Sequence, residues 1–104
     1  MADDAKVLEA IEIARNSGKI RKGANETTKA IEKGEAKLVV FASDVTPKEI
    51  IMHLSLLCKD KNVPCHEVAK KEDLGAAAGL AVSTAAIAIV KEGDAKSIID
   101  SLRA

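Results

Sequence analysis

Hydrophobic and polar positions follow two alternating patterns along the chain, which predict helices and strands in turn. The first helical stripe comprises Val7, Leu8, Ile11 and Ala14. Asp3 or Asp4 can cap this helix, and Gly18 can end it. Residues 19–22 then form at most a short extended segment.

A second helix is expected from about Asn25 to Gly34, with Ala30 and Ile31 facing inward. The run that follows, Leu38-Val39-Val40-Phe41-Ala42, is apolar at every position and rich in β-branched residues. Continuous apolar runs of this kind are typical of strands that are covered on both faces. We therefore expect a central strand at this point of the chain.

The start of a third helix is predicted from a capping pattern. Thr46 would be the N-cap, Pro47 the first helical residue and Glu49 its third, which together form a capping box. The buried stripe of this helix is predicted to comprise Ile50, Ile51, Leu54, Leu57 and Cys58.

The remaining pattern adds strands at 63–68 and 85–90, a short helix at 73–78 closed by Gly79, and a last helix. Gly93 and Asp94 are expected to cap that last helix, and its inward positions are Ile98, Ile99 and Leu102. Apolar strands that alternate with helices predict a single α/β domain over residues 1–104. Its architecture would be a three-layer α/β/α sandwich with a small mixed sheet of about four strands.

Composition narrows the classes of function. The chain has 104 residues, of which 47% are hydrophobic, but Phe41 is the single aromatic residue. Sheets that bind RNA by stacking bases on aromatic side chains are therefore excluded. The start of the chain lacks the pattern of a signal peptide, and two cysteines fit a reducing compartment, so the expected location is the cytoplasm.

Charge is balanced overall and uneven along the chain. Sixteen basic residues match sixteen acidic ones. Between Arg15 and Lys37, however, seven basic residues face three acidic ones, which leaves this segment at +4. A solvated helical face and a binding surface for an anionic partner both remain open at this point.

Catalytic and metal-binding patterns are missing from the sequence. No glycine-rich phosphate loop occurs, and the spacing of His53, Cys58, Cys65 and His66 matches no structural zinc pattern. Cys58 falls on an apolar helical stripe and Cys65 at the start of a strand, where both are expected to pack as small apolar side chains. The sequence thus predicts no enzyme, no metal and no cofactor.

One segment, Arg21-Lys22-Gly23-Ala24-Asn25-Glu26-Thr27-Thr28-Lys29, combines a basic pair, a glycine and a polar helix start. Gly23 lets a partner approach the backbone, and first-turn amides attract phosphate. Asn25 and Lys29 share a helical face beside Glu26, so an amide, a carboxylate and a cation can meet base edges. Alternatively, Asn25 is only an N-cap and Lys29 a solvated lysine.

This segment, with L-V-V-F-A-S-D-V-T-P-K-E-I-I-M-H-L and D-L-G-A-A-A-G-L, resembles the kink-turn-binding family of archaeal and eukaryotic ribosomal and small nucleolar proteins. The resemblance implies a small α/β/α sandwich that binds bends in RNA, where two stems meet at a bulge flanked by tandem sheared G·A pairs. It implies that Asn25, Glu26 and Lys29 contact the G·A pairs, with Lys22 and Gly23 near the backbone.

Two further groups of residues follow from the same resemblance. Leu80, Ala81 and Val82 would cover the bulged nucleotides, and Thr46, Ile50 and Lys71 would form a pocket for a flipped-out base. Three positions depart from the family pattern. Archaeal members usually have glutamate where Ala81 stands, many eukaryotic members have arginine at Val82, and an acidic residue is usual at Thr46.

The resemblance also implies the partners: ribosomal RNA, guide RNAs of box C/D and H/ACA particles, ribonuclease P RNA and the protein subunits of those particles. The free protein is expected to be a monomer. Two other classes stay open on the sequence alone. One is a small α/β module that binds a protein or a small ligand without RNA specificity, and the other is a cysteine-dependent enzyme.

Overall fold

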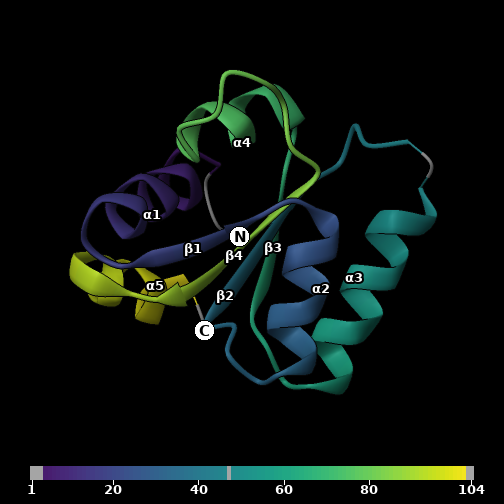
Figure 1. Cartoon of the computed structure of the whole chain (residues 1–104), viewed down its shortest axis with the longest axis horizontal. Coiled ribbons are helices and arrows are strands. Elements are labelled where there is room, and N and C mark those ends of the chain that lie inside the picture. The colour runs from purple at the N-terminus through teal and green to yellow at the C-terminus, as the bar shows by residue number, and fades with distance from the viewer. Residues whose placement is uncertain (1–3, 47, 103–104) are drawn as a thin grey trace.

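A computed structural model describes residues 4–46 and 48–102 (Figure 1). Its helices are α1 (Asp4–Ser17), α2 (Ala24–Glu32), α3 (Glu49–Asp60), α4 (Lys71–Ala77), the 3₁₀ turn η1 (Gly93–Ala95) and α5 (Lys96–Leu102). Its strands are β1 (Lys19–Lys22), β2 (Leu38–Ala42), β3 (Cys65–Val68) and β4 (Ala86–Lys91). Within these residues, every helix is too short or too polar to cross a membrane.

The strands form one mixed sheet in the order β1-β4-β2-β3. β4 runs antiparallel to both of its neighbours, β1 and β2, whereas β3 runs parallel to β2. β2 is therefore an inner strand, as its apolar run predicts, and all five of its residues are buried.

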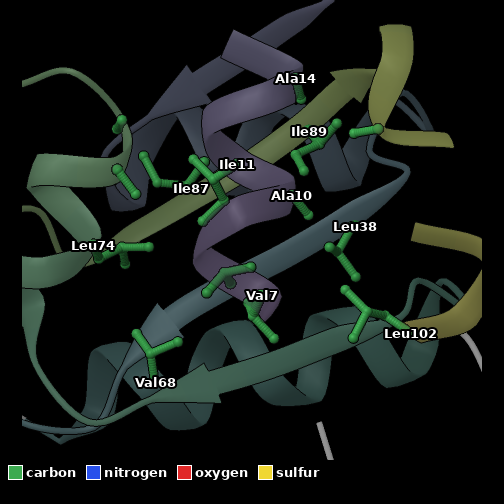
Figure 2. Packing of buried hydrophobic residues seen from close by; sticks show 14 of the residues in the cluster. Val7, Ala10, Ile11, Ala14, Leu38, Val68, Leu74, Ile87, Ile89 and Leu102 are labelled. Carbon is green, nitrogen blue, oxygen red and sulfur yellow. The ribbon is translucent and has the colours of Figure 1, made fainter. Parts of the chain in front are cut away.

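Alternation along the inner strands divides the interior into two cores. Leu38, Val40, Ile87 and Ile89 pack in the first core with α1, α4 and α5. Figure 2 shows Leu38, Ile87 and Ile89 there from close by. The alternate residues of the same two strands, which include Val39, Phe41 and Ala88, pack in the second core with α2 and α3. Figure 1 shows the same helices on the two sides of the sheet. The predicted three-layer α/β/α sandwich is confirmed.

The predicted start of the third helix is wrong. α3 begins at Glu49 with Lys48 at the capping position, where no side chain caps the helix. Thr46 lies outside α3 in an exposed bend, and Pro47 lies outside the described residues. The Lys48 ammonium donates to the Ser43 carbonyl at 2.6 Å, which ties residue 48 to the turn after β2. The helix therefore begins two residues after the position that the capping pattern predicts.

Other element ends shift by one or two residues. β3 begins at Cys65 rather than at 63, since the preceding Pro64 has no amide hydrogen to donate to the sheet. α4 begins at Lys71 rather than at 73, because the Asp44 carboxylate accepts the Lys71 amide at 2.8 Å. β4 spans Ala86–Lys91 rather than 85–90, and η1 precedes the last helix where a simple cap was expected.

The acidic residues expected to cap the first helix have another role where they are described. The Asp4 carboxylate accepts a hydrogen bond from the Ala69 amide at 3.0 Å, which joins the start of α1 to the end of β3. Asp3 lies outside the described residues.

Candidate functional site

The start of α2 is built on a glycine in a conformation that other residues rarely adopt. Gly23 is the N-cap residue and has φ 96° and ψ 158°. Its amide donates to the Ala86 carbonyl at 2.8 Å, and its carbonyl accepts the Thr27 amide at 2.9 Å. These two bonds fix the sharp turn from β1 into α2 and anchor that turn to β4.

A glycine cap leaves the first amides of α2 unsatisfied. The amides of Ala24, Asn25 and Glu26 have no acceptor within the helix, because the Thr27 amide donates the first intrahelical hydrogen bond. Gly23 has no side chain that could accept from them. Asn25 is the second residue of the helix and is exposed, so the interpretation of Asn25 as the N-cap is wrong. Among the residues that the structure describes, nothing accepts from these amides, so the helix presents free donors at its positive end.

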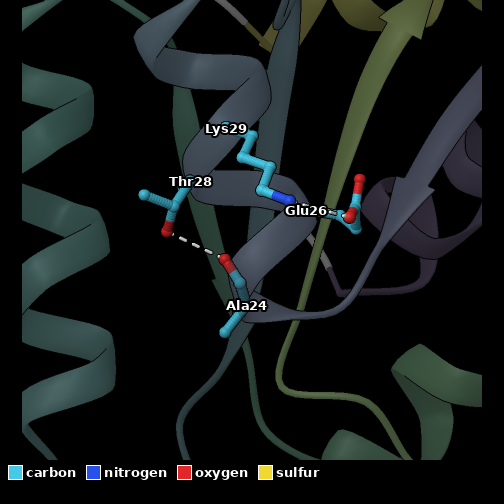
Figure 3. A network of polar contacts seen from close by, with 4 residues as sticks. All are labelled: Ala24, Glu26, Thr28 and Lys29. Carbon is cyan, nitrogen blue, oxygen red and sulfur yellow. Dashed lines mark hydrogen bonds and ion pairs between the residues drawn. The ribbon is translucent and has the colours of Figure 1, made fainter.

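Glu26 and Lys29 form a loose ion pair on the exposed face of α2 (Figure 3). Their charged atoms lie 3.6 Å apart, and their side chains are 52% and 64% exposed. Exposed pairs of this kind contribute only about 0–1 kcal/mol, so a partner can open the pair at little cost. The ion pair keeps the two side chains next to each other on the helix surface, where both remain exposed to a binding partner.

The opposite face of α2 holds the helix in place. Thr27, Ala30 and Ile31 are buried against the sheet. At the other end, the Gly34 amide donates to the Ile31 carbonyl and the Glu35 amide to the Ala30 carbonyl, both at 3.0 Å, which is a Schellman ending. The predicted stop at Gly34 is thus confirmed, and α2 forms a rigid support for the residues it exposes.

A hollow of about 300 Å³ opens between α2 and α3. It is lined by Ala24, Asn25, Thr28, Glu49, Ile50, His53 and Leu54. Asn25 and Ile50, which were predicted for two different contacts, therefore line the same cavity. Glu49 places a carboxylate in this hollow. Thr46, which is predicted to share a pocket with Ile50, does not line the hollow.

Lys71 is tied to the loop that contains Thr46 through Asp44, a residue that no sequence motif singles out. The Asp44 carboxylate accepts the Lys71 amide at 2.8 Å, and the Lys71 carbonyl accepts the Thr84 amide at 3.3 Å. Asp44 thus joins the turn after β2 to the start of α4, and the Lys71 backbone links α4 to the approach to β4. Its only signal in the sequence is an acidic residue just after a buried strand.

The loop after α4 contains Leu80, Ala81 and Val82, the apolar residues predicted to cover bulged nucleotides, and they differ in exposure. Val82 is 70% exposed and Ala81 is exposed, whereas Leu80 is half-buried and packs against the first core. Gly75 supports this loop: its carbonyl accepts the Leu80 amide at 2.9 Å, and a Cβ at Gly75 would lie 2.2 Å from the Val82 carbonyl oxygen. The loop therefore rests directly on the α4 backbone.

The two basic residues at the end of β1 face opposite sides of the sheet. Arg21 pairs with Ala88 of the second core, and Lys22 pairs with Ile87 of the first core. Residues that lie opposite one another in antiparallel strands share a face. Arg21 accordingly lines a hollow of about 150 Å³ with Glu26 and Lys29, whereas Lys22, the predicted contact, does not line it. Strand alternation could have identified Arg21.

The two cysteines pack in the second core, as predicted, but only Cys58 is fully buried there, and Cys65 is half-buried. A hydrogen bond from the Cys58 thiol lowers the pKa of Cys65 to about 7, and the same contact, together with burial, raises the pKa of Cys58. His66, next along β3, hydrogen-bonds to the Leu102 carbonyl at 2.7 Å. Across residues 4–46 and 48–102, no group of three metal-ligating side chains comes together.

The thiol pair predicts a specific pH dependence. Because the pKa of Cys65 is about 7 against an ordinary 9.0, its contribution to the free energy of unfolding grows as the pH rises from 7 to 9 and is lost below 7. We expect the alkylation rate of Cys65 to have its midpoint near pH 7. Cys58→Ala should move that midpoint towards 9, whereas Cys58→Ser, which keeps a donor, should not. An unchanged midpoint in Cys58→Ala would contradict this assignment.

Comparisons with known proteins agree with this geometry. The model of the ribosomal protein L7Ae/L30e/S12e/Gadd45 family matches residues 5–99. Among solved structures, the chain is similar to the Giardia lamblia 15.5kD RNA binding protein, with a TM-score of 0.91 and 31% sequence identity. That similarity covers 99% of this chain and 88% of the other.

Proposed function

The chain belongs to the ribosomal protein L7Ae/L30e/S12e/Gadd45 family, and on that premise we propose that it is an RNA-binding protein that recognises kink-turns. The observation that carries this proposal is the first turn of α2. Free helix amides, an exposed Asn25 and the loose Glu26–Lys29 pair lie together there on a rigid support.

Sheared G·A pairs suit this set of groups. The Asn25 amide can donate and accept, Lys29 donates, and the Glu26 carboxylate accepts hydrogen bonds from base amino or imino groups. A carboxylate disfavours binding to phosphate alone, so Glu26 supports recognition of base edges. A regular A-form helix hides those edges in its narrow groove, and a kink exposes them.

The loop after α4 would contact the bulge. Exposed Val82 and Ala81 offer an apolar cover for unpaired nucleotides, and Leu80 anchors the loop in the first core. A flipped-out base would lie near Ile50, with Thr46 and Lys71 beside it. Asp44, joined to Lys71, places an acidic group on the same loop as Thr46.

The action proposed for the protein is a shift of population. An RNA that samples straight and bent states is held in the bent state, because the protein binds that state more tightly. The protein would serve, without catalysis of its own, as a structural subunit of the ribosome and of box C/D, H/ACA and ribonuclease P particles in the cytoplasm. It would bind ribosomal and guide RNAs as a monomer, beside the other subunits of those particles.

A bending assay tests this function. A kink-turn RNA that carries fluorophores on its two stems should show a large increase in energy transfer when the protein is added at constant salt. The matched control is the same RNA without its bulge, which should bend much less. Tight binding with no change in energy transfer would contradict the proposal.

A further inference from the structure

We propose that a second basic surface, adjacent to the first turn of α2, binds the phosphate backbone of the RNA stem that carries the G·A pairs. This surface comprises Lys19, Arg21, Lys37 and Lys91 and is called here the β1 basic surface. The inference rests on the proposed function and adds to it a second contact, with a separate part of the RNA.

The β1 basic surface surrounds a hollow of about 310 Å³. Its lining consists of Lys19, Arg21, Glu35, Lys37, Val90 and Lys91, so four basic side chains face one acidic one. Lys19 and Lys91 are partners across the β1–β4 pair. The register shifts between Lys19 and Ile20, but both lysines line the same hollow, where an anion bound between them would relieve their mutual repulsion.

These basic side chains are not neutralised by the protein itself. In residues 4–46 and 48–102, the single ion pair is the one between Lys29 and Glu26. Lys19, Lys37 and Lys91 are exposed, and Arg21 is half-buried. The chain carries no net charge as a whole, so attraction of a polyanion depends on local clusters of unpaired basic side chains such as this one.

The β1 basic surface is continuous with the proposed G·A site. Arg21 and Glu35 line its hollow and also the smaller hollow that Glu26 and Lys29 line. Lys19 lies at the opposite end of β1 from Gly23, roughly 13 Å from it at about 3.3 Å per residue. At that distance Lys19 would lie beyond the G·A pairs that α2 contacts. It would face the phosphate backbone of the same stem, where the stem continues past those pairs.

The chemistry of the surface favours phosphate over bases. It offers lysine and arginine, with no aromatic side chain for stacking and no amide side chain for base edges. Its contribution should therefore be independent of stem sequence, dependent on stem length and sensitive to salt.

The test compares two kink-turn RNAs with identical bulges and G·A pairs. In one, the stem that carries the G·A pairs is cut just beyond them; in the other, it continues for a full helical turn. A triple variant replaces Lys19, Lys37 and Lys91 with glutamine. The matched control replaces Lys6, Lys59 and Lys96, three exposed lysines on α1, α3 and α5 that lie outside both hollows.

We expect the triple variant to bind the long-stem RNA on the order of tenfold more weakly, with a logarithmic salt slope shallower by about 0.9 per lost contact. Its binding to the short-stem RNA, and the binding of the control variant to both RNAs, should stay unchanged. Equal losses on both RNAs, or no loss on either, would overturn the inference. Failure of the unmodified protein to bind even the short-stem RNA would instead remove the proposed function.

Discussion

Lys29→Ala should weaken binding to a kink-turn RNA by about 1–3 kcal/mol, which is the usual loss for a side chain that contacts a base edge. The ammonium group lies 3.6 Å from the Glu26 carboxylate on the exposed face of α2, and within residues 4–46 and 48–102 it makes no other ion pair. The fold should be unaffected, because the side chain is 64% exposed and its ion pair is weak. Titration of the RNA at one fixed salt concentration measures the loss.

The control for Lys29→Ala is Lys59→Ala, which removes an exposed lysine from the far end of α3. Both variants lose one positive charge, so a general electrostatic effect would weaken them equally. The unfolding midpoint in urea should match that of the unmodified protein in both. Equal affinities of the two variants for the kink-turn RNA would contradict a base contact by Lys29.

Gly75→Ala should lower the free energy of unfolding by about 1–3 kcal/mol, as overpacking of a tight contact does. The added Cβ would lie 2.2 Å from the Val82 carbonyl oxygen and 2.9 Å from the Ser83 Cα. Both atoms belong to backbone, so either the 80–83 loop or α4 has to move. Urea denaturation measures the change in stability.

The same substitution should also affect RNA binding through the displaced loop. If Leu80–Val82 covers the bulge, Gly75→Ala should reduce the difference in affinity between a bulged RNA and one without its bulge. Ala76→Ser is the matched control, since Ala76 is the next residue of α4 and is exposed. An undiminished preference for the bulge in Gly75→Ala would argue against the contact by this loop.

The layers of the fold could be predicted from the sequence because they depend on local patterns. The unbroken apolar run of β2 requires cover on both faces, and the residues of that strand do divide between two cores. The start of α3 could not be predicted in this way. A capping pattern shows only that a helix can begin near Thr46, whereas the observed start at Glu49 leaves Thr46 in the preceding bend and Lys48 hydrogen-bonded to the Ser43 carbonyl.

The candidate site was predictable only where it is continuous in the chain. Gly23, Asn25, Glu26 and Lys29 fall within the cap and the first six residues of α2, so their helical spacing predicts their arrangement. Asp44 and Arg21 depend on contacts between distant segments. Asp44 acts on Lys71, 27 residues away, and the orientation of Arg21 follows from its register with β4.

The most direct test of the central claim is a titration against a kink-turn RNA and a twin in which both sheared G·A pairs are replaced by Watson–Crick pairs. We predict tight binding to the first RNA and binding at least about a thousandfold weaker to the twin, the usual margin between specific and non-specific complexes. Equal and weak binding to both RNAs would contradict recognition of kink-turns. It would leave a small α/β module that binds another kind of partner.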